Sequence, residues 1–252
     1  MAQAIGVDVG GTSIKAAVVD TLSGELRSER VQAATPAQAT PDEVVEIVAA
    51  LVAELQTGSG ELPVGVALPS VVIDGITKSA ANIHASWIGH PAAAHFSQAL
   101  CRPVTLINDA DAAGWAESIS GSAKGQRGLT VVTTLGTGIG SALIYDDMLI
   151  PGSELGHLEI DGHPDYERFA SSVARERDGL DYAEWGIRLT RFYQTLEHLL
   201  SPSLFVVGGG ISSVADQFLH LIDVETPLVA ARFHEHAGIV GAAGYALAHR
   251  EV

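Results

Sequence analysis

Three glycine-rich turns, each placed directly after an apolar run of strand-forming residues, constrain this chain more than any other feature of its sequence. They contain Gly10-Gly11, Gly136-Thr137-Gly138 and Gly208-Gly209-Gly210. Glycine permits positive φ and lets bare backbone N–H groups approach an anion closely, so such turns can hold phosphate. One turn alone is more often an ordinary hairpin. Three in series, with Asn108-Asp109 between the first two, predict a kinase-like phosphate cleft between two domains.

The composition is that of a chain with a well-buried core. Of its 252 residues, 47% are hydrophobic and 17% are charged, which suits one large domain or two small ones. No apolar stretch approaches the roughly 20 residues that span a bilayer, and the first predicted strand leaves no room for a signal peptide, so we expect a cytoplasmic protein. Cys101 is the only cysteine. It cannot form an intrachain disulfide, and we expect it to be a small buried hydrophobe.

The charge of the chain excludes one class of partner. Its 30 acidic and 14 basic residues give a formal net charge of −16. Nucleic acid would be repelled at long range, so we expect no nucleic-acid partner. A phosphate-bearing ligand must then be held by local groups, namely backbone N–H groups, helix N-termini, Mg²⁺ and a few placed arginines.

Hydrophobic periodicity predicts an α/β chain whose second half repeats the start of its first half. The expected elements of the first half are strands at 4–9, 14–20, 25–31, 63–68 and 103–107 and helices at 41–55, 91–100 and 110–119. Those of the second half are strands at 129–134, 139–146, 148–150 and 204–207 and helices from about 212 and 238. We therefore expect a small N-terminal domain at 1–108 and a larger domain at 109–237, facing each other across a cleft. The C-terminal helix, at about 238–252, is expected to pack back on the first domain.

Four motifs, in this order along the chain, resemble the ROK-type sugar kinases of the actin/hexokinase superfamily. They are DVGGTSIK (8–15), NDADAA (108–113), LGTGIG (135–140) and ELGHLE (154–159). Within that family the chain is most similar to the polyphosphate glucokinase branch, which includes polyphosphate/ATP glucomannokinases. The stretches that carry this similarity are ANI (81–83), SWIG (86–89), RER (175–177), WG (185–186) and AGIVGAA (237–243). The resemblance covers nearly the whole chain and implies an α/β fold of two actin/hexokinase-like (ribonuclease H-like) domains.

Asp109 is the candidate general base. It follows the apolar run 104–107 and precedes Ala-rich helical sequence, which places it at the carboxyl end of a strand and near a helix N-terminus. Local sequence alone favours Asp109 or its neighbour Asn108 as an ordinary helix N-cap. The resemblance implies catalysis instead, because the ROK pattern has its base at this aspartate, where it accepts the proton of a sugar hydroxyl during phosphoryl transfer.

Sugar recognition needs several paired donors and acceptors, because a polar group left unpaired in a closed pocket costs about 1–3 kcal/mol. The candidates are Asn82, Ser70, Asn108, Asp109, Glu154, His157 and Glu159. Gly156 allows a sharp bend, through which one loop can present the last three side chains to one ligand. Ser70 stands where ROK kinases usually have glycine, and its N–H or hydroxyl could still reach the sugar.

The set Glu154, His157 and Glu159 also suits a metal ion, so a metal site is the alternative reading of this loop. ROK proteins with a structural zinc add a cysteine cluster after the histidine. This chain has DGHP (161–164) there. We therefore expect no zinc.

The donor side of the site is expected at the first two glycine turns. Its members are Gly10, Gly11, Thr12, Lys15, Thr134, Gly136, Thr137 and Gly138. Lys15 could equally be a solvated strand residue, and Asp8 would hold Mg²⁺ through water. Gly208, Gly209 and Gly210 lie where the superfamily receives the far end of the donor, the nucleoside if the donor is ATP. None of these turns fits the G-x-G-x-x-G dinucleotide motif.

Five of the chain's few cations fall in one short region and give the only hint of a polyphosphate donor. They are Arg168, Arg175, Arg177, Arg188 and Arg191. Arginine matches phosphate oxygens bidentately, whereas the interspersed acidic residues favour an ordinary salt-bridged helical surface. The apolar residues of the same region have the spacing of a buried helical stripe. They are Trp185, Leu189, Phe192, Leu196 and Leu199.

These features imply an Mg²⁺-dependent hexose kinase that makes glucose 6-phosphate, with inorganic polyphosphate, ATP or both as donors and mannose as a second candidate acceptor. ROK kinases for N-acetylmannosamine, fructose or allose remain alternatives, as does a catalytically silent sugar-binding protein. A ROK-type repressor is disfavoured, because such proteins carry an N-terminal DNA-binding module, whereas this chain starts with the phosphate strand. The resemblance also implies a homodimer.

Overall fold

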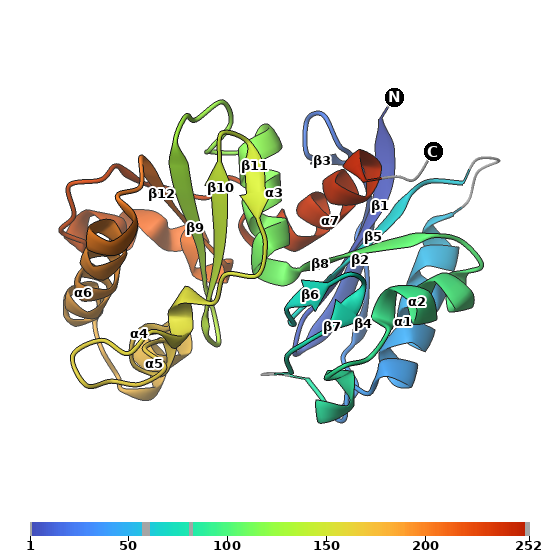
Figure 1. Ribbon diagram of the computed structural model, residues 1–252, viewed down its shortest axis with the longest axis horizontal. Coiled ribbons are helices and arrows are strands. Elements are labelled where there is room, and N and C mark those ends of the chain that lie inside the picture. Colours follow the sequence, from blue (N-terminus) through green and yellow to red (C-terminus); the bar gives the residue numbers. More distant parts are fainter. Residues whose placement is uncertain (1, 57–60, 81–82, 250–252) are drawn as a thin grey trace. The chain divides into compact units, whose positions relative to one another are not determined.

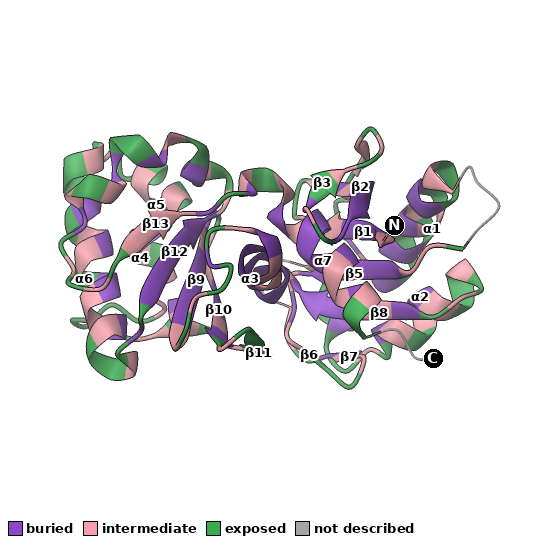
Figure 2. Cartoon of the chain, turned by 90° about the horizontal axis from the view of Figure 1, so that it is seen from above, coloured by how far each residue is buried: buried purple, intermediate pink, exposed green. Residues whose placement is uncertain are grey.

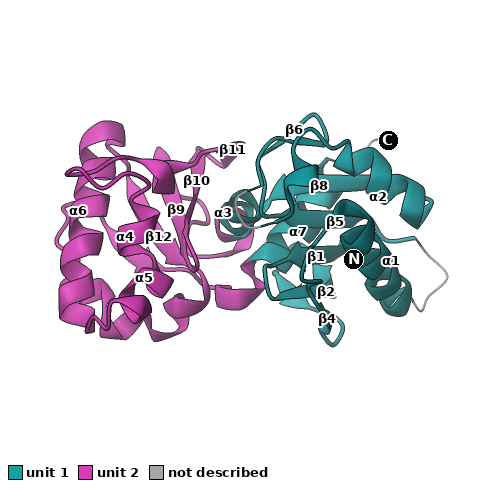
Figure 3. Cartoon of the chain, turned by 90° about the horizontal axis from the view of Figure 1, so that it is seen from below, with its two compact units in different colours: residues 1–116, 238–252 teal, residues 117–237 magenta. Residues whose placement is uncertain are grey.

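The computed structural model describes residues 2–56, 61–80 and 83–249. The chain forms two compact units, residues 1–116 with 238–252 (unit 1) and residues 117–237 (unit 2), as Figure 3 shows. Each unit contains its own sheet (Figure 1). The division into domains at 108/109 stays a prediction. Within the described ranges, no helix is both long enough and apolar enough to cross a membrane.

The sheet of unit 1 has six strands in the order β3-β2-β1-β5-β8, with β4 also paired to β2. They are β1 (Gln3–Val9), β2 (Ser13–Asp20), β3 (Glu25–Leu26), β4 (Val31–Ala34), β5 (Val64–Leu68) and β8 (Val104–Asn108). β1 and β2 form an antiparallel hairpin, whereas β1, β5 and β8 run parallel. The helices are α1 (Pro41–Leu55), α2 (Ala92–Leu100), α7 (Ala237–Ala248) and the greater part of α3 (Asp109–Ser120).

The start of α1 follows from its sequence. Pro41 occupies the first turn of the helix, where a backbone N–H has no hydrogen-bond acceptor within the helix, so the lack of this group in proline costs nothing. The Glu43 carboxylate accepts hydrogen bonds from the N–H (3.0 Å) and the hydroxyl (2.8 Å) of Thr40, and these bonds lower the pKa of Glu43. The apolar side of the helix is buried as its spacing predicts, through Val44, Val45, Val48, Leu51 and Val52.

Alternation along the central strands decides which helix covers each face of the sheet, and most residues of these strands are buried (Figure 2). Val7 and its alternate neighbours on β1 belong to the core shared with α1 and α2. On the other face, Gly6 and Gly65 lie against α7. A Cβ on Gly6 would lie only 1.9 Å from the carbonyl oxygen of Ile239. Glycine is therefore required for this close helix–sheet contact.

We expect Gly65→Ala to destabilise the protein, because its Cβ would lie 2.0 Å from the Ala242 carbonyl oxygen of α7. Overpacking against backbone forces the helix away from the sheet, and the free energy of unfolding should fall by about 3 kcal/mol in urea titrations. Gly210→Ala is the matched control, since a Cβ there would meet nothing within 4 Å. Equal stabilities of the two variants would contradict this account of α7.

The sheet of unit 2 repeats the strand order of unit 1, namely β11-β10-β9-β12-β13. Its strands are β9 (Leu129–Leu135), β10 (Ile139–Tyr145), β11 (Met148–Ile150), β12 (Leu204–Gly208) and β13 (Leu228–Ala230). The first three are antiparallel, and β12 runs parallel to both β9 and β13. Short helices α4 (Glu167–Ala170) and α5 (Ser172–Arg177) precede the long helix α6 (Tyr182–Leu200). The predicted repeat is confirmed, and the fold is the two-domain actin/hexokinase-like α/β fold.

One predicted strand and one predicted helix differ from the structure. The strand expected at 25–31 is interrupted, because the Ser28 hydroxyl accepts the Val18 N–H (3.0 Å) in place of a strand partner, leaving β3 and β4 as short pieces. The helix expected from about 212 is replaced by the 3-10 turns η3 (Gly210–Gln217) and η4 (Leu219–Leu221), with a non-helical residue at Val214. Propensity alone did not reveal the small hairpin of β6 (Val72–Ile73) and β7 (Ile76–Thr77), nor β13.

Two burial predictions were also wrong. Leu199 is 59% exposed, whereas the other four residues of the α6 stripe are fully buried. Cys101 is exposed and ends α2 with a left-handed φ of 53°, so it does not act as a core residue. In both cases the residue lies at a helix end, where the core no longer covers it.

Candidate active site

The carboxyl ends of the parallel strands of unit 1 meet at one edge of its sheet. The register pairs Leu68 of β5 with Asn108 of β8, and β1 ends beside them just after Asp8. Asp109 follows the end of β8 directly, and Ser70 lies two residues after the end of β5. Ligands of parallel α/β sheets bind at this edge. The fold thus brings together candidates from three distant parts of the sequence.

The turn between β1 and β2 presents its glycines to solvent. The Gly10 N–H donates to the Ser13 carbonyl (3.1 Å), and the Thr35 hydroxyl donates to the Gly10 carbonyl (2.6 Å). Gly11 and Thr12 are exposed, and a Cβ on Gly11 would meet nothing within 4 Å. An anion can therefore approach the backbone at Gly11 closely.

Asp8 lies against the start of α7. A Cβ on Gly238 would lie 2.7 Å from the Asp8 Cγ, so that position needs glycine. Burial raises the pKa of Asp8 to about 6, and Lys15, its direct cross-strand neighbour, acts in the opposite direction. The residue keeps partial exposure to solvent. Its carboxylate is a hard oxygen ligand whose ionised form a bound cation would stabilise.

Asn108, and not Asp109, caps helix α3. The Asn108 Oδ1 accepts the N–H groups of Ala110 (2.9 Å) and Asp111 (3.0 Å), and its Nδ2 donates to the Ser70 carbonyl (3.3 Å). Asp109 is the first residue of α3 and is partly exposed, with its Oδ1 also accepting the Ala110 N–H (2.9 Å). The capping function therefore belongs to Asn108, which leaves Asp109 as the candidate base.

Ser70 is buried, and both groups that it was expected to offer to a sugar have partners inside the chain. Its N–H donates to the Leu68 carbonyl (2.8 Å), and its hydroxyl donates to the Ser79 carbonyl (2.7 Å). These bonds hold Ser70 in place, and its carbonyl in turn accepts the bond from the Asn108 Nδ2. The other candidate of this region, Asn82, lies outside the described residues.

The turn between β9 and β10 is tied to α4 and α5. The Gly136 carbonyl accepts the Ser172 hydroxyl (3.0 Å), and the Glu167 carboxylate accepts the Ile139 N–H (2.9 Å). A Cβ on Gly138 would lie 2.2 Å from the Glu167 Oε2. A side chain at this position would displace the Glu167 carboxylate, which comes from a later helix.

The third glycine turn lies beside the second. The register pairs Gly208 of β12 with Thr134 of β9. Gly209 has a φ of 83°, and a Cβ there would lie 2.5 Å from the Leu135 carbonyl oxygen. Gly210 is exposed, as is Thr137 in the neighbouring turn. Unit 2 therefore brings both of its predicted donor turns to one edge of its sheet.

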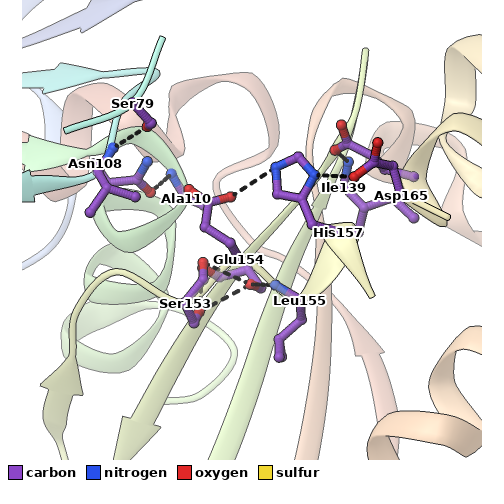
Figure 4. A network of polar contacts seen from close by, with 12 residues as sticks. Ser79, Asn108, Ala110, Ile139, Ser153, Glu154, Leu155, His157 and Asp165 are labelled. Atoms are coloured by element: carbon purple, nitrogen blue, oxygen red, sulfur yellow. Dashed lines mark hydrogen bonds and ion pairs between the residues drawn. The ribbon is translucent and has the colours of Figure 1, made fainter. Parts of the chain in front are cut away.

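His157 lies between two carboxylates, as Figure 4 shows. Its Nδ1 is 3.1 Å from the Asp165 Oδ1, and its Nε2 is 3.7 Å from the Glu154 Oε2. Since an ionised carboxylate only accepts, the Asp165 contact places a proton on Nδ1 and leaves Nε2 of the neutral ring as an acceptor for a ligand hydroxyl. Partial burial and the nearby Glu167 raise the pKa of Glu154, and His157 lowers it.

The loop that carries Glu154 and His157 is anchored on β10. The Ser141 Oγ accepts the Leu155 N–H (3.0 Å), and the Ser153 hydroxyl donates to the Ser141 carbonyl (2.8 Å) (Figure 4). A Cβ on Gly156 would lie 2.2 Å from the carbonyl oxygen of Ile139. Glycine is required at this position because the loop backbone passes close to β10.

Unit 2 adds two carboxylates to the set that the sequence suggested. Glu154, His157 and Glu159 are all exposed, and Glu167 lies close enough to Glu154 to raise its pKa. Asp165 and Glu167 were missed because neither belongs to a recognisable spacing pattern, and only the fold brings them to the loop. Among the described residues, no three or more His, Cys, Asp or Glu side chains are grouped so as to hold a metal ion.

All five arginines of the 168–191 region have partners inside unit 2. Arg191 pairs bidentately with Asp161 (2.5 and 2.8 Å), and Arg188 contacts Asp178 (2.7 Å). The remaining partners are Asp165 for Arg168, the Tyr182 ring and Glu176 for Arg175, and Asp178 for Arg177. A salt-bridged surface, the alternative to polyphosphate binding, accounts for all of these contacts.

Two ribonuclease H-like units, glycine turns at their sheet edges and a carboxylate at the start of α3 define a protein of the sugar-kinase class. The sequence profile of the ROK family matches residues 4–177, and the chain belongs to this family.

Its relatives include polyphosphate-dependent kinases. The polyphosphate glucokinase of Mycobacterium tuberculosis (strain CDC 1551 / Oshkosh) is 45% identical over 240 residues, covering 94% of this chain and 89% of that protein. The inorganic polyphosphate/ATP-glucomannokinase of Arthrobacter sp. strain KM is 48% identical with a TM-score of 0.94, and the match covers 100% of both chains. A ROK family glucokinase from Streptomyces griseus, solved with glucose and AMPPNP, is 28% identical with a TM-score of 0.82, covering 96% of this chain and 98% of that one.

Proposed function

We propose that this chain is a glucokinase that transfers a phosphoryl group from inorganic polyphosphate or ATP to the 6-hydroxyl of glucose. The observation that carries the proposal is the meeting of Asp8, the open turn at Gly11 and Asp109 at one sheet edge of unit 1. The similarity to polyphosphate glucokinases and to a glucomannokinase supports the donor and the acceptor.

In the transfer, the 6-hydroxyl oxygen forms a bond to the terminal phosphorus while the bond from that phosphorus to the rest of the donor breaks. Asp109 accepts the hydroxyl proton, and the departing phosphate oxygen keeps the electron pair of the broken bond. The backbone N–H groups around Gly11 stabilise the charge on the transferring group. Asn108 holds the start of α3, and with it the position of Asp109.

Mg²⁺ fits the chemistry of Asp8. This ion needs only one or two carboxylates when water and the donor's phosphates supply the other ligands. Asp8 lies two residues before Gly10 of the first glycine turn and is partly exposed. When bound, Mg²⁺ would offset the negative charge of the donor phosphates.

The acceptor groups of unit 2 suit the sugar. Glu154 and Glu167 can accept sugar hydroxyls, and Asp165 holds the His157 ring so that Nε2 does the same. Mannose differs from glucose at one hydroxyl, so we propose it as a second acceptor, supported by the glucomannokinase relative.

His157→Ala should weaken glucose binding more than it slows turnover. The variant loses an acceptor that acts both before and during transfer, so calorimetry should give a dissociation constant for glucose about tenfold higher. His220→Ala, at an exposed histidine of η4 whose Nδ1 lies 3.1 Å from the Asp216 carbonyl oxygen, is the control. Unchanged glucose affinity in His157→Ala would remove His157 from the sugar site.

A matrix of donors and sugars tests the function as a whole. Purified protein is assayed with polyphosphate and with ATP, each against glucose, mannose, fructose and N-acetylmannosamine. Glucose-dependent consumption of either donor is the expected result. A preference for fructose or N-acetylmannosamine would reassign the acceptor, and no consumption with any sugar would contradict the proposal.

We also propose a cytoplasmic homodimer. β11 is an edge strand, and the exposed fractions of Tyr145, Met148 and Ile150 on and beside it are 51%, 66% and 48%. An edge strand with exposed apolar side chains favours pairing with another chain. The lone exposed Cys101 suits a reducing compartment.

A further inference from the structure

A pocket of about 320 Å³ adjoins the first glycine turn of unit 1. It is lined by Gly11, Thr35, Pro36, Ala37, Gln38, Ala39, Ile83 and His84. Its volume equals that of about ten water molecules in the liquid, which leaves room for more than one phosphoryl group. Apart from Gly11, none of these residues has a role in the transfer described above.

The pocket wall and the glycine turn are hydrogen-bonded to each other. The Thr35 N–H donates to the Thr12 carbonyl (3.0 Å), and the Thr35 hydroxyl donates to the Gly10 carbonyl (2.6 Å). Gly11 belongs both to the turn and to the pocket lining. A phosphate chain whose end lies on the turn can therefore extend directly into the pocket.

The shape of the wall is maintained at a conformational cost. Ala39 has a φ of 46°, in the left-handed region that disfavours residues with a Cβ. Its carbonyl accepts the Nε1–H of the fully buried Trp87 (2.8 Å). Strained residues persist where the surrounding structure holds them, and they concentrate at ligand sites. The pocket is thus formed before any ligand binds.

The lining suits an anion. None of the described residues that line it is a carboxylate, although the chain has a net charge of −16. The larger pocket of unit 1, beside β8, differs, because Glu61 and Asp74 line it. Glu43 interacts electrostatically with one lining residue: two hydrogen bonds from Thr40 lower its pKa, and His84 lowers it further.

His84 supplies a hydrogen-bond donor in either protonation state. Its Nδ1 accepts the Ser86 N–H (3.2 Å), so the neutral ring carries its proton on Nε2. Gln38 adds an amide that can also donate to phosphate oxygens.

We propose that this pocket receives the distal phosphoryl groups of the polyphosphate donor, beyond the group that is transferred. The inference rests on the proposed function and extends it to the choice of donor. A linear polyphosphate carries negative charge along its whole length. Each bound phosphoryl group therefore needs hydrogen-bond donors around it and no carboxylate facing it. ATP replaces that distal stretch by a nucleoside, which makes no use of this pocket.

Opposite charges at Gln38 test the proposal. Gln38→Glu should raise the KM for long-chain polyphosphate about fivefold, and Gln38→Lys should lower it, because one charge is placed beside a phosphate chain in partly solvated surroundings. The KM values for ATP and glucose should stay within about twofold, and added salt should shrink both effects. His84→Asn keeps a capping acceptor for the Ser86 N–H while removing the imidazole, and should also raise the KM for polyphosphate.

Gln98→Glu, at an exposed position on α2, is the matched control for net charge and should change no KM. Thermal unfolding of each variant checks that the fold is retained. Unchanged polyphosphate kinetics, or equal changes with ATP, would overturn the proposal while leaving the kinase function intact. A changed KM for glucose would instead assign the pocket to the sugar and would overturn it as well. Absence of glucose-dependent donor consumption in the unaltered protein would show that the proposed function itself is wrong.

Discussion

Asp109→Asn should lower kcat for glucose phosphorylation by at least about a hundredfold while leaving the fold and the glucose affinity unchanged. General-base assistance contributes roughly 10²- to 10⁴-fold, and an amide cannot accept the hydroxyl proton. Because Asn108 caps α3, the substitution leaves the helix start in place, and the new side-chain oxygen can still accept the Ala110 N–H. Steady-state kinetics and calorimetry with glucose measure the two quantities.

The neighbouring residue provides the contrast. Asn108→Ala removes the cap of α3 and should lower the free energy of unfolding by about 1 kcal/mol, with a smaller loss of kcat than Asp109→Asn. Turnover close to that of the unaltered protein in Asp109→Asn would exclude Asp109 as the base.

Asp8→Asn should stabilise the protein at pH 7 by up to about 3 kcal/mol when no Mg²⁺ is present. The carboxyl of Asp8 has a folded-state pKa of about 6, against 3.8 for an aspartate in the unfolded chain, chiefly because burial disfavours its charge. Between these values the folded chain holds a proton that the unfolded chain has released. Stability of the unaltered protein therefore falls as pH rises through this window, and the full cost is present above it.

Urea titrations over a range of pH test this sign. The advantage of Asp8→Asn should be absent near pH 4, grow through about pH 5 to 6 and be complete by about pH 7. Mg²⁺ should stabilise the unaltered protein at pH 7 and should not stabilise the variant, a readout that does not depend on catalysis. A variant less stable than the unaltered protein at pH 7 would contradict the account of Asp8.

Much of the fold could be predicted from interactions between residues that are close together in the sequence. The strands before the glycine turns, the buried stripe of α1 and the position of Asp109 between a strand and a helix all follow from local periodicity and from glycine's backbone freedom. The order of the motifs also indicated the family. Where prediction failed, a side chain had replaced a backbone partner, as at Ser28, or a helix end had left the core, as at Leu199 and Cys101.

The sequence by itself thus determined the turns and the strands that repeat in the two sheets, because each depends on residues close together in the chain. The candidate base came from the order of the family motifs. Only the tertiary structure decided that Asn108 caps α3, that Glu167 neighbours Glu154, and that Asp165 holds His157. It also decided that Arg188 and Arg191 are paired with Asp178 and Asp161, and that a pocket without carboxylates among its described lining residues adjoins Gly11. These outcomes depend on which groups come within hydrogen-bonding distance after folding, and no spacing along the chain encodes that distance.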